Sequence, residues 1–161
     1  MKPRSRLEWT LEGIALGGVL SPFAITALFW SELPERIAVH FDFEGQPNGW
    51  GPRALMFTIP VINSMSYLLL TAIGSRAHSM QGMNLPAKVN RDHPEVRRLG
   101  RELISWVKAL MTLLMSYLTW GKAQVALGRS AAMGSALPLA TVAVILLLAI
   151  FYTSRMKRLG Q

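Results

Sequence analysis

Four long apolar segments, separated by polar ones, dominate the pattern of hydrophobic and polar positions along this chain. They cover residues 11–30, 54–73, 103–120 and 136–153. A helix needs about 20 residues to cross the apolar layer of a bilayer, and each segment approaches that length. The pattern therefore predicts an all-α integral membrane protein with four transmembrane helices, organised as a single membrane domain over residues 1–161.

The polar segment between the first two apolar segments, residues 31–53, has the pattern of a folded loop. Apolar side chains alternate over residues 37–43, as in a short strand. Residues 44–49 are typical of two consecutive turns in which Gly45 and Gly49 supply positive φ angles, and the Asn-Gly pair is a strong turn signal. We therefore expect a short strand and turns that fold as a cap between the first two helices.

Small and polar residues inside the apolar segments predict contacts between helices. Gly13 and Gly17 form a GxxxG pair, which lets another helix approach closely. Asn63 and Tyr67 are four residues apart and share one helix face, where interhelical hydrogen bonds or a substrate path would satisfy them. Lys108 lies inside the third segment, and we expect its long stem to carry the ammonium toward the headgroups.

Lysine and arginine are distributed unevenly among the polar segments. Twelve lie in the N-terminal segment, in residues 74–102 and in the C-terminal tail, whereas four lie in residues 31–53 and in the connection between the third and fourth helices. Cytoplasmic segments of membrane proteins carry an excess of these residues. The distribution predicts that both termini and residues 74–102 are cytoplasmic and that the loop of residues 31–53 lies outside.

The net charge of +8 has the same origin, because the basic residues flank apolar segments; nucleic acid is therefore not an expected partner. The chain contains no cysteine, which excludes disulfides and thiolate metal sites. No phosphate-binding loop, nucleophile elbow or HExxH motif is present in the sequence. We expect neither a cofactor nor an enzymatic activity.

His40 and Asp42 are the main candidates for chemistry in the loop. Two residues apart on an extended segment, their side chains lie on the same side, which is compatible with a His–carboxylate pair. Glu44 would be a third ligand if they formed half of a metal site. The alternatives are that His40 fastens the loop through a backbone carbonyl, which we favour, or that it responds to a ligand or to protons. Trp50 is expected to anchor at the membrane interface rather than to act as a ligand platform.

A motif runs through the same loop. Its positions are Leu33, Pro34, Arg36, Ile37, Val39, His40, Phe41, Gly45, Pro47, Gly49, Trp50 and Gly51. This motif resembles the signature of a bacterial domain of unknown function that is found in Sdp-type immunity and signalling membrane proteins. Three positions depart from it: Ala38 stands where proline is common, Asp42 where asparagine is common, and Arg53 where lysine is usual.

The resemblance implies a multi-pass protein of the bacterial cytoplasmic membrane whose loop lies outside. The best-understood members protect a producing cell from its own secreted peptide toxin and draw a small repressor to the membrane. They are longer than this chain and have additional helices. We therefore expect a protein that binds or senses a peptide or small ligand at the outer face, in an immunity-like or signal-transducing role.

Two further partners are expected besides the lipid bilayer. The basic run of Arg97, Arg98 and Arg101 either marks cytoplasmic orientation alone or docks an acidic cytoplasmic partner or anionic lipid. The alternative function is an accessory or structural subunit of a membrane complex or transporter, assembled as an oligomer through the GxxxG face. A membrane enzyme that uses His40 and Asp42 is a third reading.

Overall fold

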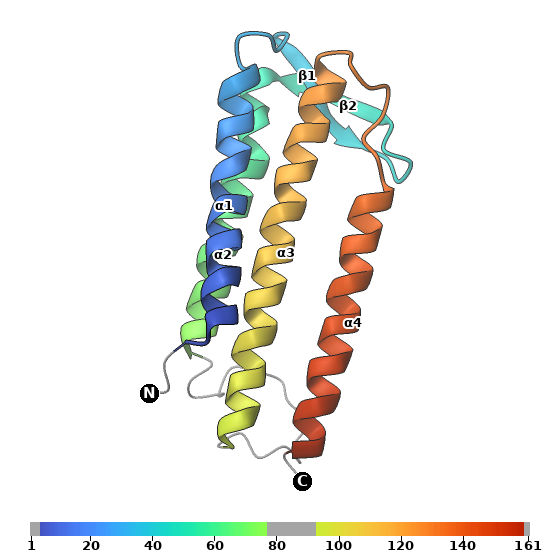
Figure 1. The fold of residues 1–161 in the computed structure, drawn as a ribbon. Helices are drawn as coiled ribbons and strands as arrows, with labels where there is room; N and C mark the ends of the chain where they lie inside the picture. The colour runs from blue at the N-terminus through green and yellow to red at the C-terminus, as the bar shows by residue number, and fades with distance from the viewer. Residues whose placement is uncertain (1–3, 77–92, 160–161) are drawn as a thin grey trace.

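The computed structural model describes residues 4–76 and 93–159, and it consists of four long helices and one two-stranded hairpin (Figure 1). In chain order the elements are α1 (Arg6–Phe29), β1 (Arg36–Phe41), β2 (Pro47–Pro52), the 3-10 helix η1 (Arg53–Phe57), α2 (Thr58–Arg76), α3 (Pro94–Ala126) and α4 (Ala136–Leu159). The expected fold class is confirmed. The predicted loop of residues 74–102 is partly helical at both ends, and its middle lies outside the described residues.

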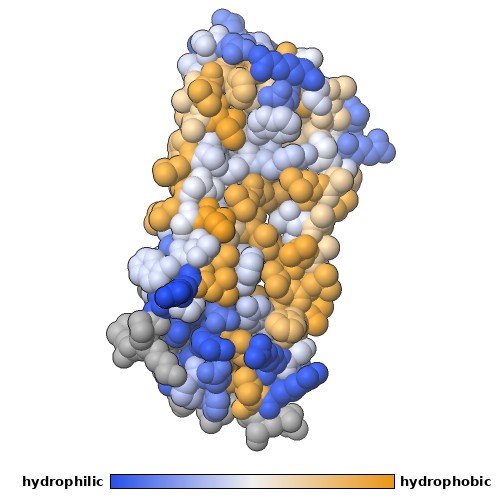
Figure 2. All heavy atoms as spheres, in the orientation of Figure 1, coloured by the Kyte–Doolittle hydropathy of each residue, from blue (hydrophilic) through white to orange (hydrophobic). Residues whose placement is uncertain are grey.

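All four helices are long and apolar enough to cross a membrane. The space-filling view shows hydrophobic side chains along the middle of the bundle and hydrophilic ones at its two ends (Figure 2). An apolar surface of this kind faces lipid in a protein that spans a bilayer. The chain is therefore a multi-pass membrane protein. Its "hairpin end" carries β1 and β2, and its "terminal end" carries the described ends of the chain, near residues 4 and 159 (Figure 1).

Helix α3 is the centre of the bundle, because it packs against α1, α2 and α4. Helix α4 packs against α3, but only 6% of its most apolar 18-residue stretch is buried, compared with 33% of the corresponding stretch of α1. The main cluster between α3 and α4 lies toward the terminal end and contains Leu99, Leu103 and Met156. Most of α4 therefore faces outward, and it stands apart from α1 and α2 (Figure 1).

Local sequence sets where two of these helices begin. Ser5 caps α1 in a capping box, in which its hydroxyl accepts from the Glu8 N–H and the Glu8 carboxylate accepts from the Ser5 N–H. His93 caps α3, and Pro94 occupies the first turn, where its missing N–H costs nothing. The helix then runs for 33 residues to Ala126, past the predicted end at residue 120.

The hairpin contains two strands, where the sequence predicted one strand followed by two turns. Strands β1 and β2 are antiparallel, and Ala38 lies opposite Trp50. Gly45 has the expected positive φ of 81°, but Gly49 is not in that region; it lies in β2 opposite His40. The prediction of a turn at the Asn-Gly pair is therefore wrong. The chain instead reverses over residues 42–46, because the Asp42 side chain accepts hydrogen bonds from two backbone N–H groups there.

Candidate functional site

The hairpin is fastened to the bundle by a small apolar cluster. Leu33, Ile37, Met56 and Ala123 are buried against one another, so the start of β1, η1 and the end of α3 share one core. Burial of this kind stabilises by about 25 cal/mol per Å² of apolar surface removed from solvent. A backbone bond of 2.8 Å from the Arg53 N–H to the carbonyl of residue 35 closes the base of the hairpin.

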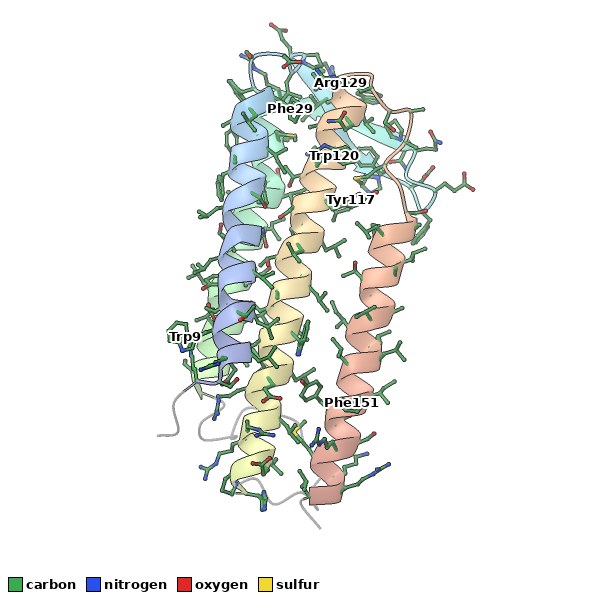
Figure 3. The ribbon with its side chains drawn as sticks, viewed as in Figure 1. Trp9, Phe29, Tyr117, Trp120, Arg129 and Phe151 are labelled. Atoms are coloured by element: carbon green, nitrogen blue, oxygen red, sulfur yellow. The ribbon has the colours of Figure 1, made fainter. Side chains whose placement is uncertain are left out.

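The connection between α3 and α4 holds the other end of the hairpin. The Met133 N–H donates to the Gly45 carbonyl over 2.8 Å. A Cβ atom at Gly45 would overlap the backbone of Met133, so this contact requires glycine for space as well as for its φ angle. Arg129 in the same connection pairs with Glu32 at 2.6 Å and lies over the ring of Phe29 (Figure 3). The hairpin is thus held at its base by the apolar cluster and at its turn by the α3–α4 connection.

A groove of about 460 Å³ lies beneath the hairpin. Its walls are formed by strand β1, the residues from η1 into α2, the C-terminal part of α3 and the α3–α4 connection. The lining residues are Val39, His40, Phe41, Leu55, Thr58, Ile59, Leu118, Lys122 and Met133. Most are apolar, and three carry polar side chains. This size and composition are those of sites that bind small molecules, which occupy about 300–1,000 Å³.

His40 and Asp42 bond to different partners within the hairpin. The Nδ1 atom of His40 lies 2.5 Å from the Oδ1 atom of Asn48, across the two strands. The Asp42 carboxylate accepts from the N–H groups of Glu44 and Gln46. His40 therefore bonds across the hairpin to a side-chain amide, and not to the backbone carbonyl that was favoured from the sequence. No three His, Asp or Glu side chains lie close enough to share a metal ion within residues 4–76 and 93–159.

The other motif residues divide between the core, the groove and the surface. Leu33 is buried in the apolar cluster, and Phe41 lines the groove. Pro47 begins β2 opposite Phe41, and Pro34 is exposed before β1. Trp50 is 55% exposed and is not among the groove residues. The motif thus builds one wall of the groove and its attachment to the bundle.

Lys122 is the charged groove residue that sequence reasoning missed. It entered only as a charge in the connection between the third and fourth helices. In the structure it lies on α3, four residues before the last residue of the helix, and it is 4% exposed. Its Nζ atom donates to the Leu55 carbonyl over 2.9 Å. The apolar spacing that continues through residues 121–126 was the available signal that α3 extends this far.

A network of charged side chains lies near the other end of the bundle. The Nζ atom of Lys108 lies 2.6 Å from a Glu12 carboxylate oxygen, and the Tyr67 hydroxyl donates to the same carboxylate. Lys108 is 4% exposed, so the expectation that it extends toward the headgroups is wrong. A buried ammonium is stable when a carboxylate compensates it, and Glu12 on α1 supplies one within reach.

Two residues of the basic run also have partners within the chain. Arg101 pairs with Glu8 on α1 at 2.9 Å. Arg98 pairs with Glu95 and Glu102 on its own helix. These two arginines therefore contribute to packing and helix stability at the terminal end. The run was singled out as an orientation signal or as a docking site for an acidic partner or anionic lipid, and both stay predictions.

Close approach between α1 and α3 occurs at Gly18 rather than at the GxxxG pair. A Cβ atom at Gly18 would lie 2.5 Å from the hydroxyl oxygen of Thr112, whereas no atom of another described element lies within 4 Å of such an atom at Gly13 or Gly17. The Asn63 amide of α2 donates to the Gly18 carbonyl over 2.8 Å. Three helices therefore meet at Gly18, and the pair of glycines faces outward.

The comparisons with known proteins assign one segment of the chain. The family model described as "Domain of unknown function (DUF1648)" matches residues 17–63, which comprise the second half of α1, the hairpin, η1 and the start of α2. No curated protein and no solved structure matches the chain. The matched segment contains β1 and the residues of η1 and α2 that line the groove; α3 and the α3–α4 connection, which close it, lie beyond the match.

Proposed function

We propose that this chain binds a peptide or small ligand in the groove beneath the hairpin, at the outer face of a bacterial cytoplasmic membrane, in an immunity-like or signal-transducing role. The observation that carries the proposal is the groove itself, a mostly apolar hollow of about 460 Å³ at one end of the bundle. Its wall includes motif residues His40 and Phe41. The bias of lysine and arginine toward the terminal end supports the outward orientation of the hairpin end.

The position of the groove also supports a signalling role. A ligand there would contact β1, the start of α2 and Lys122 of α3 together. Helix α3 packs against every other helix and carries Arg101 at its opposite end. A shift of α3 on binding would therefore reach the cytoplasmic face, where the Arg101–Glu8 pair and the basic run lie.

The groove can be tested by filling it. Leu118 lines the groove, whereas Leu113 lies on the same helix, is 47% exposed and is not among the lining residues. Cells expressing the wild type, Leu118→Trp or Leu113→Trp would be challenged with the peptide fraction secreted by the native host. We expect the wild type and Leu113→Trp to protect equally, and Leu118→Trp to lose protection at equal membrane content. Equal protection by all three chains would remove the groove from this role, and no protection by the wild type would overturn immunity.

The chain contains no cysteine, so single cysteines introduced at chosen positions can report which side of the membrane the hairpin faces. Phe43 at the hairpin tip is fully exposed, and Ser154 lies near the terminal end of α4. In intact cells, a membrane-impermeant maleimide should label Phe43→Cys and should label Ser154→Cys only after permeabilisation. The reverse pattern would place the hairpin in the cytoplasm and contradict the proposal.

A second candidate is an accessory or structural subunit, and it rests on the outward faces of the helices. No other element in the described part of the chain lies within 4 Å of a Cβ atom placed on Gly13 or Gly17, and α4 has most of its surface free of the other described helices. A partner helix in a larger complex would fit such faces. Crosslinking in native membranes through Gly13→Cys would yield dimers or larger adducts under this alternative, whereas a strictly monomeric product would count against it.

A further inference from the structure

The charge of Lys122 has no anionic partner in the described part of the chain. Its side chain lines the groove, and the residue is 4% exposed. No Asp or Glu oxygen among residues 4–76 and 93–159 lies within ion-pair distance of it, whereas Lys108, which is equally buried, has Glu12 at 2.6 Å. The two lysines are thus alike in burial and different in compensation.

Burying an ammonium without a counter-charge is unfavourable, because water is lost and little replaces it. An ammonium has three N–H donors, and the Leu55 carbonyl accepts one of them. The negative end of the α3 dipole, one turn away, offsets part of the cost. Both are partial charges, so the site retains a net positive charge that an arriving anion would neutralise.

The remaining groove surface determines what kind of anion fits. None of the lining residues is acidic, and beside Lys122 the polar side chains are those of His40 and Thr58. Six lining residues are apolar: Val39, Phe41, Leu55, Ile59, Leu118 and Met133. A small hydrated anion would leave these apolar walls exposed to water, while a neutral apolar chain would leave the ammonium uncompensated.

We propose that the groove binds an anionic amphiphile, with its acidic head group on the Lys122 ammonium and its hydrocarbon chain against the apolar wall formed by Phe41, Ile59 and Leu118. This rests on the proposed function, because it specifies the ligand class of the same groove. A free fatty acid and an anionic phospholipid share this chemistry. The competing explanation is that Lys122 only ties α3 to η1 through the Leu55 carbonyl.

Thermal unfolding of the full chain in a neutral maltoside detergent separates these explanations. The probes are oleate, dioleoyl phosphatidylglycerol, their neutral counterparts methyl oleate and dioleoyl phosphatidylcholine, and inorganic phosphate. A ligand at 100 times its Kd should raise the Tm by about 5–10 °C. We expect this shift with one or both anionic amphiphiles and not with the neutral ones or phosphate. A shift with oleate alone identifies a free acid, and a shift with the phosphatidylglycerol identifies a lipid.

Three variants assign the effect to the ammonium. Lys122→Met should abolish the shift while its Tm without ligand equals or exceeds that of the wild type, because an uncompensated charge has been removed. Lys122→Arg should keep most of the shift. Arg129→Met is the matched control, since Arg129 is an exposed cation at the same end, is paired with Glu32 and does not line the groove; it should keep the full shift.

Several results would overturn the inference. These are an equal shift with methyl oleate, the full shift with phosphate alone, no shift with any amphiphile, or an unchanged shift in Lys122→Met. A lowered Tm of Lys122→Met without ligand, with no ligand effect in the wild type, would establish the structural tie instead. The groove-filling experiment with Leu118→Trp stands apart, because it does not depend on the charge of the ligand. If the Tm-shift experiment failed while the Leu118→Trp experiment gave its expected result, the proposed function would remain in place.

Discussion

Replacing Gly18 with alanine should destabilise the bundle, and the same change at the adjacent Gly17 should not. A Cβ atom at position 18 would lie 2.5 Å from the Thr112 hydroxyl oxygen, 2.8 Å from its Cβ atom and 3.0 Å from its backbone carbonyl carbon. Two of these three atoms cannot be moved by a rotamer change alone. At Gly17 the added methyl group has no neighbour within 4 Å among the other elements of residues 4–76 and 93–159.

The comparison isolates the cost of the overlap. Alanine is favoured over glycine in a helix by about 1 kcal/mol, and this gain is common to both variants. Forcing an extra methyl group into a packed interface costs about 1–3 kcal/mol. The free energy of unfolding of Gly18→Ala should therefore lie about 1–3 kcal/mol below that of Gly17→Ala.

Reversible unfolding in mixed micelles with increasing dodecyl sulfate, followed by far-ultraviolet circular dichroism, measures this difference. Adding Thr112→Ala to Gly18→Ala should recover part of the loss, because it removes the hydroxyl oxygen but leaves the Cβ and backbone atoms in place. Equal free energies for Gly18→Ala and Gly17→Ala would refute the assignment of the close approach to Gly18. A lower value for Gly17→Ala would restore the GxxxG pair as the packing site.

Three other predictions concern the charge network and the hairpin. Lys108→Met should lower the free energy of unfolding by up to about 3–5 kcal/mol, because the largely buried Glu12 carboxylate would keep only the longer pair with Arg4 and the Tyr67 hydroxyl. Glu12→Leu in the same chain should restore at least half of the loss, and strictly additive losses would contradict this. Gly45→Ala should speed proteolysis in the α3–α4 connection about tenfold. The strained φ angle and the overlap with Met133 together would oppose the contact between the hairpin and this connection by more than about 1 kcal/mol. An unchanged rate of proteolysis would argue against a stabilising role of the Gly45–Met133 contact. Trp50→Ala should leave the oleate-induced Tm shift unchanged, because Trp50 lies outside the groove. Loss of the Tm shift in this variant would place the ligand site on the other face of the hairpin.

Hydropathy and charge predicted the bundle well because both act over long segments. Twenty apolar residues specify a span whatever their order, so the four helices were visible in the sequence. Their ends were less visible. Residues 121–126 contain Gly121 and Lys122, which resemble a connecting segment, and the apolar spacing that continues through them is weak. Their packing against η1 and the hairpin completes the last turns of α3.

The interior contacts could not be predicted because they join residues far apart in the sequence. The Glu12–Lys108 pair depends on α1 and α3 meeting in one register, and no local pattern encodes that register. Gly17 and Gly18 differ in one helical step, about 100° of rotation, and this step decides which of them meets α3. In the hairpin, the turn forms at residues 42–46 instead of at the Asn-Gly pair, because the Asp42 side chain accepts hydrogen bonds from two backbone N–H groups there.

The most direct test of a ligand site beneath the hairpin is photo-crosslinking with a diazirine-bearing fatty acid, followed by mapping of the labelled residues. The groove predicts that adducts gather on lining residues such as Ile59, Leu118 and Met133, and that excess oleate removes them while methyl oleate does not. Labelling spread over the outward residues of α4, such as Leu146 and Ile150, with no competition by oleate, would mean that the chain meets the probe only as bulk lipid and would contradict the ligand site.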